Sequence, residues 1–233
     1  ADYLVKKSVW GVGGDGWAFD IGYGGLDHVL ASQRNINLLV LNTQMYSNTG
    51  GQASTASLTG QDSDLSRFGA AHSGKQEDRK ELGLIAAFHP NVFVVQACTA
   101  LQGHFMKNVM QYLNHNDSPA VLDVYTPCQA EHGIADSAAS HRSRLAGSSR
   151  MNPVFVHDPR KGATLHGRFS LDGNPSLDTD WPVYTLNYID DTGARQKMEL
   201  PLTFADFAAT EARFLKQFRK APPETWNDSM VPL

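Results

Sequence analysis

Four short apolar runs, separated by segments of helical length, constrain the fold of this chain more than any other feature of its sequence. The strand-like runs cover residues 8–14, 37–41, 92–97 and 120–125. The segments with helical patterning between them cover residues 26–34, 77–89 and 101–115. Strands that are covered on both faces are apolar along their length, and their alternation with helices is typical of a parallel sheet. We therefore predict an α/β protein with a doubly wound, mostly parallel sheet.

The C-terminal part of the chain departs from this alternation. Its expected elements are a short strand, a loop, a hairpin and a helix, over residues 154–157, 158–181, 181–200 and 203–220. The hairpin turns at Asp191-Thr192-Gly193, because Asp and Gly supply the turn geometry, and Thr203 can cap the helix. We predict a domain over residues 1–157 and a C-terminal hairpin-plus-helix extension over residues 158–233.

Composition and charge exclude several classes of function. The formal net charge is -4 without a basic block, which gives no support for binding to nucleic acid or to a membrane surface. The apolar runs are too short to span a bilayer, and the N-terminal residues do not resemble a signal peptide. Two cysteines are too few for a disulfide scaffold, so a reduced, cytoplasmic setting is expected. The chain opens just before its richest motif, as a piece of a longer protein would.

A carboxylate lies between glycines where the first strand gives way to a helix, in Gly13-Gly14-Asp15-Gly16-Trp17. Glycine lets the backbone approach a ligand closely. Mg²⁺ prefers oxygen ligands and usually bridges to phosphate, and the N–H groups at a helix start can bind anionic oxygens. The pattern therefore suits a metal and a phosphate group. The alternative is a tight turn in which Asp15 only caps the helix.

The polar loop after the second strand, residues 42–60, can complete such a site. One helix and one strand separate Asp15 from Thr43, so adjacent parallel strands would bring both to the same edge of the sheet. There Thr43 offers a hydroxyl and Met45 a backbone carbonyl. A diphosphate and water would complete an octahedral set around Mg²⁺. An ordinary polar surface loop is the alternative.

The sequence from Val9 to Gln52 resembles the thiamine diphosphate signature of the pyruvate:ferredoxin (flavodoxin) oxidoreductase family. Its motif reads Gly-Gly-Asp-Gly-Trp-Ala-Phe-Asp-Ile-Gly-Tyr-Gly-Gly-Leu-Asp-His, followed after a strand by Tyr-Ser-Asn-Thr-Gly-Gly-Gln. Weaker similarity extends to about residue 135. The resemblance implies the thiamine diphosphate-binding fold, in the half that binds the diphosphate. It implies Mg²⁺ ligation by Asp15, Thr43 and the carbonyl of Met45.

Further roles follow from the same resemblance. The residues that match the lining of the diphosphate are Gly14, Gly16, Trp17 and Ser47. Asn48 matches a catalytic asparagine that reaches toward the thiazolium ring and the substrate, where a preorganised amide can donate to a developing oxyanion. Asn48-Thr49-Gly50 is also a good turn on its own. The chain departs from the family where Asn42 and Gln44 replace an acidic pair, and residues 61–74 look remodelled.

Cys128 lies in Tyr125-Thr126-Pro127-Cys128, which resembles the family's Tyr-Ser-Pro-Cys. The family's cysteine completes the [4Fe–4S] cluster nearest the thiamine. Such clusters usually need four thiolates, and the other three would lie in sequence upstream of this chain. Cys128 is therefore either one ligand of a cluster or an inert thiol. Cys98, at the end of an apolar strand, is expected to serve packing.

The resemblance implies a part of an enzyme that oxidatively decarboxylates a 2-oxoacid of the pyruvate type, with ferredoxin or flavodoxin as electron acceptor and CoA as acyl acceptor. Its implied partners are upstream domains or subunits that carry the pyrimidine-binding half and the cluster cysteines, together with further copies of itself. The isolated chain is expected to be inactive, because the glutamate that activates the aminopyrimidine has no counterpart here. Two alternatives remain: a non-catalytic cofactor-binding or structural domain of a larger redox protein, and an interaction domain without cofactor.

Overall fold

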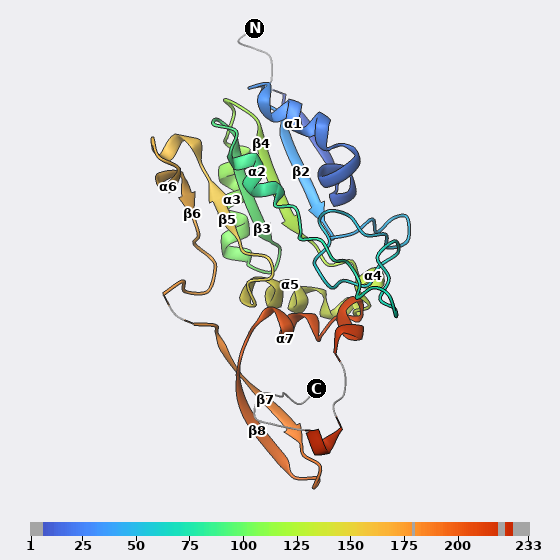
Figure 1. Cartoon of the computed structure of the whole chain (residues 1–233). Coiled ribbons are helices and arrows are strands. Elements are labelled where there is room, and N and C mark those ends of the chain that lie inside the picture. The colour runs from blue at the N-terminus through green and yellow to red at the C-terminus, as the bar shows by residue number, and fades with distance from the viewer. Residues whose placement is uncertain (1–6, 179, 219–221, 226–233) are drawn as a thin grey trace.

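A six-stranded sheet forms the centre of the computed structural model, which describes residues 7–178, 180–218 and 222–225. The strand order is β1-β2-β4-β3-β5-β6, and a separate hairpin, β7-β8, lies beyond the carboxyl edge of the sheet (Figure 1). Four parallel strands make up most of the sheet: β1 (Trp10–Gly14), β2 (Asn37–Asn42), β3 (Phe93–Cys98) and β4 (Ala120–Tyr125). The short strands β5 (Phe155–His157) and β6 (Phe169–Ser170) are antiparallel additions at one edge. The predicted α/β class with a mostly parallel sheet is confirmed.

Helices cover both faces of the sheet. The elements between the parallel strands are a π-helical turn η1 (Gly16–Ile21), α1 (Tyr23–Ala31), α2 (Leu82–Ala87) and α3 (Gln102–Leu113). Side chains of α1 and α2, such as Leu30 and Leu82, share one core cluster with Val94 of the sheet. Tyr112 of α3 belongs to a second cluster with Val95 on the opposite face. The sheet is therefore doubly wound, as the apolar runs predict.

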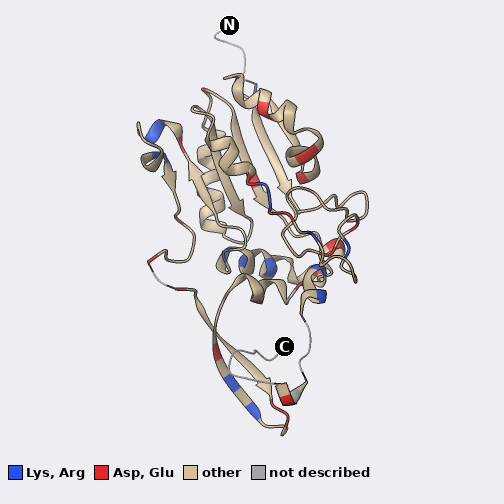
Figure 2. Ribbon diagram, viewed as in Figure 1, with Lys and Arg blue, Asp and Glu red and all other residues tan. Residues whose placement is uncertain are grey.

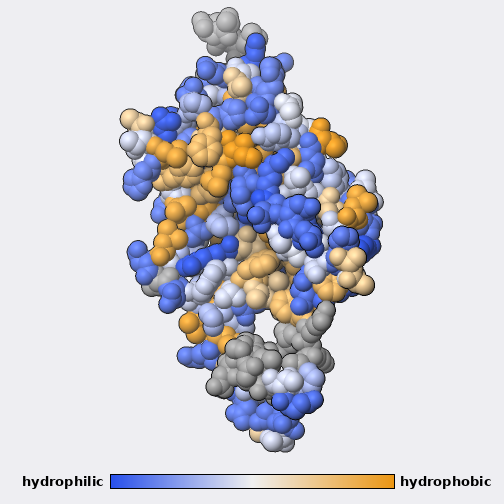
Figure 3. Space-filling view, in the orientation of Figure 1, coloured by the Kyte–Doolittle hydropathy of each residue, from blue (hydrophilic) through white to orange (hydrophobic). Residues whose placement is uncertain are grey.

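Charged side chains lie mainly outside the central strands. Figure 2 shows these strands almost free of charged residues, which lie on the surrounding helices, on the hairpin and in the loops beyond the carboxyl edge. Apolar side chains remain exposed over α2 and the end of the sheet near β6 (Figure 3), where Phe88, the residue that follows α2, is 73% exposed. Among the described residues, no helix is long and apolar enough to cross a membrane.

Most of the chain after β4 lies beyond the carboxyl edge of the sheet, whereas residues 159–168 lie at the opposite end (Figure 1). Its elements are α4 (Gln129–His132), η2 (Asp136–Ala138), α5 (Ala139–Ser148), η3 (Pro159–Lys161), α6 (Leu165–Arg168), β7 (Val183–Ile189), β8 (Arg195–Pro201), α7 (Phe204–Ala208), η4 (Ala212–Gln217) and η5 (Pro223–Thr225). The predicted hairpin is present and turns at Asp190–Ala194. Thr203 caps α7 in a reciprocal capping box with Asp206. The division at residue 157 stays a prediction, and β6 pairs with β5 across it.

Two helices are shorter than the sequence pattern predicts. The helix expected at residues 203–220 ends at Ala208, because Glu211 takes an extended conformation before the 3₁₀ turn η4 begins. Residues 219 and 220 lie outside the described part of the chain. The helix expected at residues 77–89 begins only at Leu82, because the backbone N–H of Lys80 donates to the carbonyl of Thr55 at 2.8 Å. At the second of these places, a contact with the loop after β2 prevents further helix.

The extension shares a core with the sheet domain, so we expect the two to unfold together. Phe207 is fully buried in a cluster that also contains Cys98 and Tyr125 of the sheet. Phe207→Ala should lower the free energy of unfolding by about 3–5 kcal/mol in urea denaturation, because it leaves a large cavity. The transition should remain single when it is followed by both fluorescence and circular dichroism. Separate transitions for the two parts would contradict this shared core.

Candidate functional site

The three predicted oxygen ligands meet at the carboxyl edge of the sheet. Asp15 follows β1 and Thr43 follows β2, and the parallel register that pairs Gly14 with Leu41 brings the two side by side. Thr43 Oγ1 lies 3.0 Å from Asp15 Oδ1 and 3.1 Å from the carbonyl oxygen of Met45. We call these three residues, Asp15, Thr43 and Met45, the oxygen cluster. A carboxylate, a hydroxyl and a carbonyl are the donor types that Mg²⁺ prefers.

The carboxylate of Asp15 is buried and contacts no cationic side chain among the described residues. Its residue is 1% exposed, and burial raises the pKa of the carboxyl group above its usual range. Ser54 Oγ donates to Oδ2 at 2.6 Å, and the backbone N–H of Thr43 donates to Oδ1 at 3.1 Å. Within the described residues no lysine or arginine pairs with it. A buried carboxylate that has hydrogen bonds but no counter-charge fits a bound cation.

The loop that carries Thr43 and Met45 turns through an unusual backbone conformation. Gln44 has a φ of 61°, in the left-handed region that residues other than glycine rarely occupy. Ser57 Oγ and Gln61 Nε2 donate to its carbonyl oxygen at 2.5 and 3.3 Å. These bonds fix the conformation of the turn. The fixed turn directs the side chain of Thr43 and the carbonyl of Met45 toward Asp15.

A buried histidine holds the same loop through a hydrogen bond to its backbone. His132 of α4 is fully buried, and its Nε2 bonds to the carbonyl oxygen of Thr43 at 2.8 Å. Burial, with the nearby guanidinium of Arg213, holds the pKa of His132 well below its usual range. The imidazole is therefore neutral at physiological pH, and Nε2 carries the proton that it donates to the carbonyl.

The other predicted site residues divide into two groups. Ser47 joins the oxygen cluster directly, since its Oγ donates to Thr43 Oγ1 at 2.8 Å. Gly14 lies beside the cluster at the end of β1, and a Cβ there would meet nothing closer than 3.9 Å. A Cβ at Gly16 would lie 2.4 Å from the ring of Tyr46, so this glycine is needed for internal packing.

Three predicted residues are not brought into the oxygen cluster. The indole of Trp17 packs back on β1, where a Cβ at Gly13 would lie 2.5 Å from it. Asn48 is exposed and has no hydrogen bond from its amide to the described part of the chain. Cys128 is a free, half-buried thiol at the start of α4. Among the described residues, no group of three or more His, Cys, Asp or Glu side chains is arranged to hold a metal.

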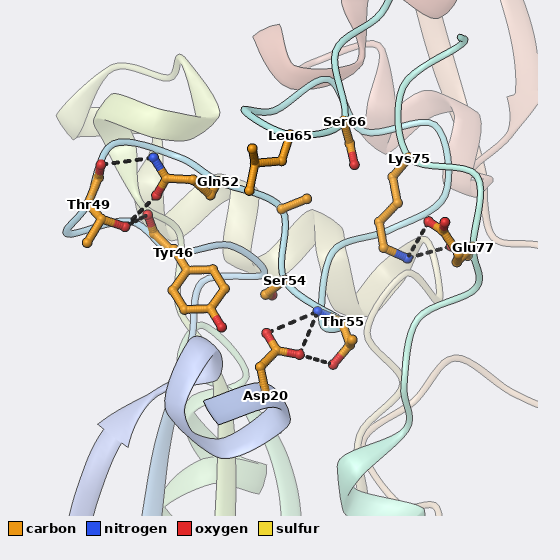
Figure 4. Close-up of a pocket in the computed structure, with 11 residues that line it drawn as sticks. Asp20, Tyr46, Thr49, Gln52, Ser54, Thr55, Leu65, Ser66, Lys75 and Glu77 are labelled. Atoms are coloured by element: carbon orange, nitrogen blue, oxygen red, sulfur yellow. Dashed lines mark hydrogen bonds and ion pairs between the residues drawn. The ribbon is translucent and has the colours of Figure 1, made fainter. Parts of the chain in front are cut away.

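A cavity of about 650 Å³ is lined in part by Ser54, whose hydroxyl contacts Asp15, whereas none of the three residues of the oxygen cluster lines it (Figure 4). One wall comes from η1 and the loop after β2, including Asp20 and Ser54, and Asp20 accepts a hydrogen bond from Thr55 Oγ1 at 2.6 Å. The opposite wall comes from the segment that the sequence marks as remodelled, with Leu65 and Ser66, and from the residues that follow it, with Lys75. Burial lowers the pKa of the Lys75 ammonium group.

Sequence reasoning missed two of the residues that shape this site. Ser54 lies in the polar loop but carries no motif of its own, and its contact with Asp15 spans 39 positions. Lys75 follows the remodelled segment, and its Nζ donates to the carbonyl of Glu77 at 2.6 Å. The polar composition of the loop was the only signal for Ser54. Nothing in the local pattern distinguishes Lys75 from a surface lysine.

Comparison with known proteins places the chain among oxidoreductases, although no family model matches it. It is 42% identical over 172 residues to a pyruvate:ferredoxin oxidoreductase of Moorella thermoacetica, covering 73% of this chain and 14% of that protein. It is 48% identical over 194 residues to a pyruvate-flavodoxin oxidoreductase of Trichormus variabilis, covering 80% and 15%. A solved 2-oxoglutarate:ferredoxin oxidoreductase from Magnetococcus marinus matches with a TM-score of 0.42 and 20% identity, over 57% of this chain and 51% of its own.

The fold and the oxygen cluster define a doubly wound α/β protein in which oxygen groups converge where β1 and β2 end. By sequence the chain belongs to the pyruvate:ferredoxin (flavodoxin) oxidoreductase family, whose members are oxidoreductase enzymes. It spans only 14% to 15% of the length of these relatives.

A second buried carboxylate, that of Asp123, contacts Asn42, the last residue of β2. Asp123 of β4 is 3% exposed, and burial raises the pKa of its carboxyl group to about 7. Asn42 Nδ2 donates to Asp123 Oδ1 at 3.1 Å, while Asn42 Oδ1 accepts from the backbone N–H of Gln44 at 3.1 Å. The amide at position 42 therefore gives Asp123 a donor and fixes the next turn of the loop. A second carboxylate at position 42 would instead repel it.

The raised pKa of Asp123 predicts a pH-dependent stability. The folded chain binds the proton more tightly than the unfolded chain does, so stability falls as pH rises from about 4 through 7. Asp123→Asn removes this penalty and keeps an acceptor for Asn42. In urea denaturation, the variant should gain stability over the wild type at pH 8, by on the order of a few kcal/mol, and clearly less at pH 5.

Asp190, exposed on the hairpin, provides the matched control. Hydrogen bonds from Thr192 and Gln196 lower the pKa of Asp190 to about 2, so its contribution is constant above pH 5. Asp190→Asn should therefore change stability equally at pH 5 and pH 8. An equal gain for Asp123→Asn at both pH values would show that its carboxyl group does not titrate in this range.

Proposed function

We propose that the oxygen cluster holds Mg²⁺ and, through it, the diphosphate of thiamine diphosphate. The observation that carries this proposal is the convergence of Asp15, Thr43 and the Met45 carbonyl around a buried carboxylate that has no cationic partner among the described residues. The chain would thus be the thiamine diphosphate-binding domain of a pyruvate-type 2-oxoacid:ferredoxin or flavodoxin oxidoreductase. Its sequence relatives carry the names of such enzymes.

Each residue of the site then has a definite task. Asp15, Thr43 and Met45 supply three oxygen ligands, and the diphosphate and water supply the others. Gly14 leaves room for the cofactor at the end of β1, and Ser47 can turn its hydroxyl from Thr43 to a diphosphate oxygen. When bound, thiamine diphosphate supplies a carbon nucleophile for the 2-oxo group and accepts the electrons that remain when CO₂ leaves.

Asn48 is the residue of this chain that we assign to catalysis. It follows Ser47 and is exposed, so its amide is free to face a bound ligand. An amide N–H held at that place donates to the oxygen on which negative charge develops. Trp17 belongs to the proposed cofactor site as a support, because its indole packs against Gly13, before the Asp15 turn, and Gly22, after it.

The proposal assigns the remaining parts of the reaction to other domains or subunits. These would carry the pyrimidine-binding half, the activating glutamate and the other cysteines of a [4Fe–4S] cluster to which Cys128 contributes one ligand. Ferredoxin or flavodoxin would accept the electrons, CoA would accept the acyl group, and self-association would complete the assembly. The isolated chain would bind the cofactor without turning over pyruvate.

Replacing the carboxylate of Asp15 by an amide separates binding from folding. Asp15→Asn should weaken Mg²⁺-dependent binding of thiamine diphosphate, followed by calorimetric titration, at least about tenfold, since a charged ligand is lost. The same change should raise the melting temperature, because it removes a buried charge that has no counter-ion. A merely structural Asp15 would not give these opposite effects.

Asp27→Asn, on the exposed side of α1 where Asp27 pairs with His89, is the control and should leave binding unchanged. Pyrophosphate with Mg²⁺ should compete with the cofactor for the wild-type site. Wild-type binding that is independent of Mg²⁺, or equal weakening by Asp15→Asn and Asp27→Asn, would refute the assignment of the metal site.

A further inference from the structure

A buried ion pair from the C-terminal extension contacts the loop that carries Thr43, Gln44 and Met45. Arg213 and Glu211 are 3% and 0% exposed, and Arg213 Nε donates to Glu211 Oε2 at 2.6 Å. Neither residue belongs to the stretch that resembles the family motif. A buried charge pair costs desolvation energy unless its remaining donors and acceptors are satisfied, so the partners of the guanidinium are informative.

The other donors of Arg213 reach into the loop. Its Nη2 donates to Gln44 Oε1 at 2.9 Å, and its Nη1 donates to Gln61 Oε1 at 3.0 Å. Gln61 in turn donates to the carbonyl oxygen of Gln44. The planar guanidinium therefore links the extension to both ends of the same glutamine, in a fork geometry that a lysine cannot reproduce.

Gln44 is the residue whose conformation sets the oxygen cluster. It stands between Thr43 and Met45 and has a left-handed φ of 61°, which the surrounding contacts must maintain. Gln44 Nε2 also contacts the sulfur of Met151 at 3.3 Å, so its side chain is fixed at both polar atoms. Loss of Arg213 would remove the only charged donor that holds this side chain among the described residues.

We propose that Arg213, neutralised by Glu211, is a positioning residue for the oxygen cluster. It holds Gln44 in the left-handed conformation that turns the Thr43 hydroxyl and the Met45 carbonyl toward Asp15. The statement about metal binding rests on the proposed function, whereas the control of the loop conformation does not. The extension thereby acts on a site that is built from the opposite end of the chain.

Charge balance explains why position 44 is neutral here. One guanidinium faces one carboxylate, and the other titratable groups packed against the pair, His132 and Tyr125, are uncharged. Burial holds the pKa of His132 well below its usual range and raises that of the Tyr125 hydroxyl. A glutamate at position 44 would place a second carboxylate on Arg213 and leave a net buried charge. Gln44 and Glu211 are thus alternative positions for the same counter-charge.

A first experiment compares three arginine variants in the full chain. Arg213→Met should weaken Mg²⁺-dependent binding of thiamine diphosphate about tenfold or more, and Arg213→Lys should recover stability but not affinity, because lysine keeps the charge and loses the fork. Arg160→Met is the matched control. Arg160 also pairs with an aspartate two positions earlier, at 2.8 Å, but lies far from the cluster in η3. It should leave affinity unchanged.

A second experiment exchanges the counter-charge. Gln44→Glu alone and Glu211→Gln alone should each weaken binding, because each unbalances a buried charge. The double variant should recover a binding affinity within about threefold of that of the wild type, since the effects of substitutions at contacting residues are strongly non-additive. Each variant should also be followed by hydrogen exchange of the Tyr46 amide, which donates to the carbonyl of Gln52 at 2.9 Å and reports on the loop without any ligand.

The two readouts distinguish the two proposals. If the wild type does not bind Mg²⁺ and cofactor but exchange at Tyr46 still accelerates in Arg213→Lys and recovers in the double variant, the positioning role stands and the proposed function fails. If the wild type binds and Arg213→Lys binds equally, with unchanged exchange at Tyr46, Arg213 is only a structural ion pair. Purely additive effects of Gln44→Glu and Glu211→Gln would overturn the shared counter-charge.

Discussion

The buried carboxylate of Asp15 is the constraint on which the arrangement of the carboxyl edge depends. Three hydrogen bonds from Thr43 and Ser54 satisfy its oxygens, yet none of them supplies a positive charge. Parallel pairing of β1 with β2 brings these groups together, and the left-handed turn at Gln44 completes the set. A protein keeps such a costly group where a ligand contributes the missing charge, which is why stability and binding oppose each other at this residue.

The parts of this arrangement that follow from local pattern could be predicted from the sequence. The apolar runs identify the strands because both faces of the sheet are covered, and strands that end together bring Asp15 and Thr43 to one edge. The helix expected at residues 203–220 shows where such reasoning fails. Its apolar spacing is helical, but the helix ends at Ala208, before Arg213, whose guanidinium donates to Gln44, 169 positions earlier in the chain. Contacts that span more than a hundred positions leave no periodic trace.

Long-range contacts also account for the other residues that local reasoning missed. Ser54, Gln61 and Arg213 act on Asp15 or on Gln44 from separate segments, and each is an ordinary polar residue in its own stretch of sequence. Residues 61–80 and the C-terminal extension both pack on the loop after β2, although β3, β4 and β5 lie between them in the sequence. The loop is therefore held by parts of the chain outside the recognisable motif, which maintain its strained backbone conformation at Gln44.

Positions 42 and 44, which are acidic in the family motif, are neutral in this chain. The carboxylates instead lie on residues that are connected to these two positions by hydrogen bonds. Asn42 and Gln44 are neutral, but the first donates to the carboxyl group of Asp123 and the second accepts from the guanidinium that Glu211 neutralises. A side-chain amide can both donate and accept hydrogen bonds. Asn42 and Gln44 therefore link these carboxylates to the turn without adding charge beside Asp15. The proposed metal site would thus remain singly charged while two further carboxylates shape its surroundings. Affinity for a divalent cation would then depend on geometry at Thr43 and Met45 more than on the sum of nearby charges.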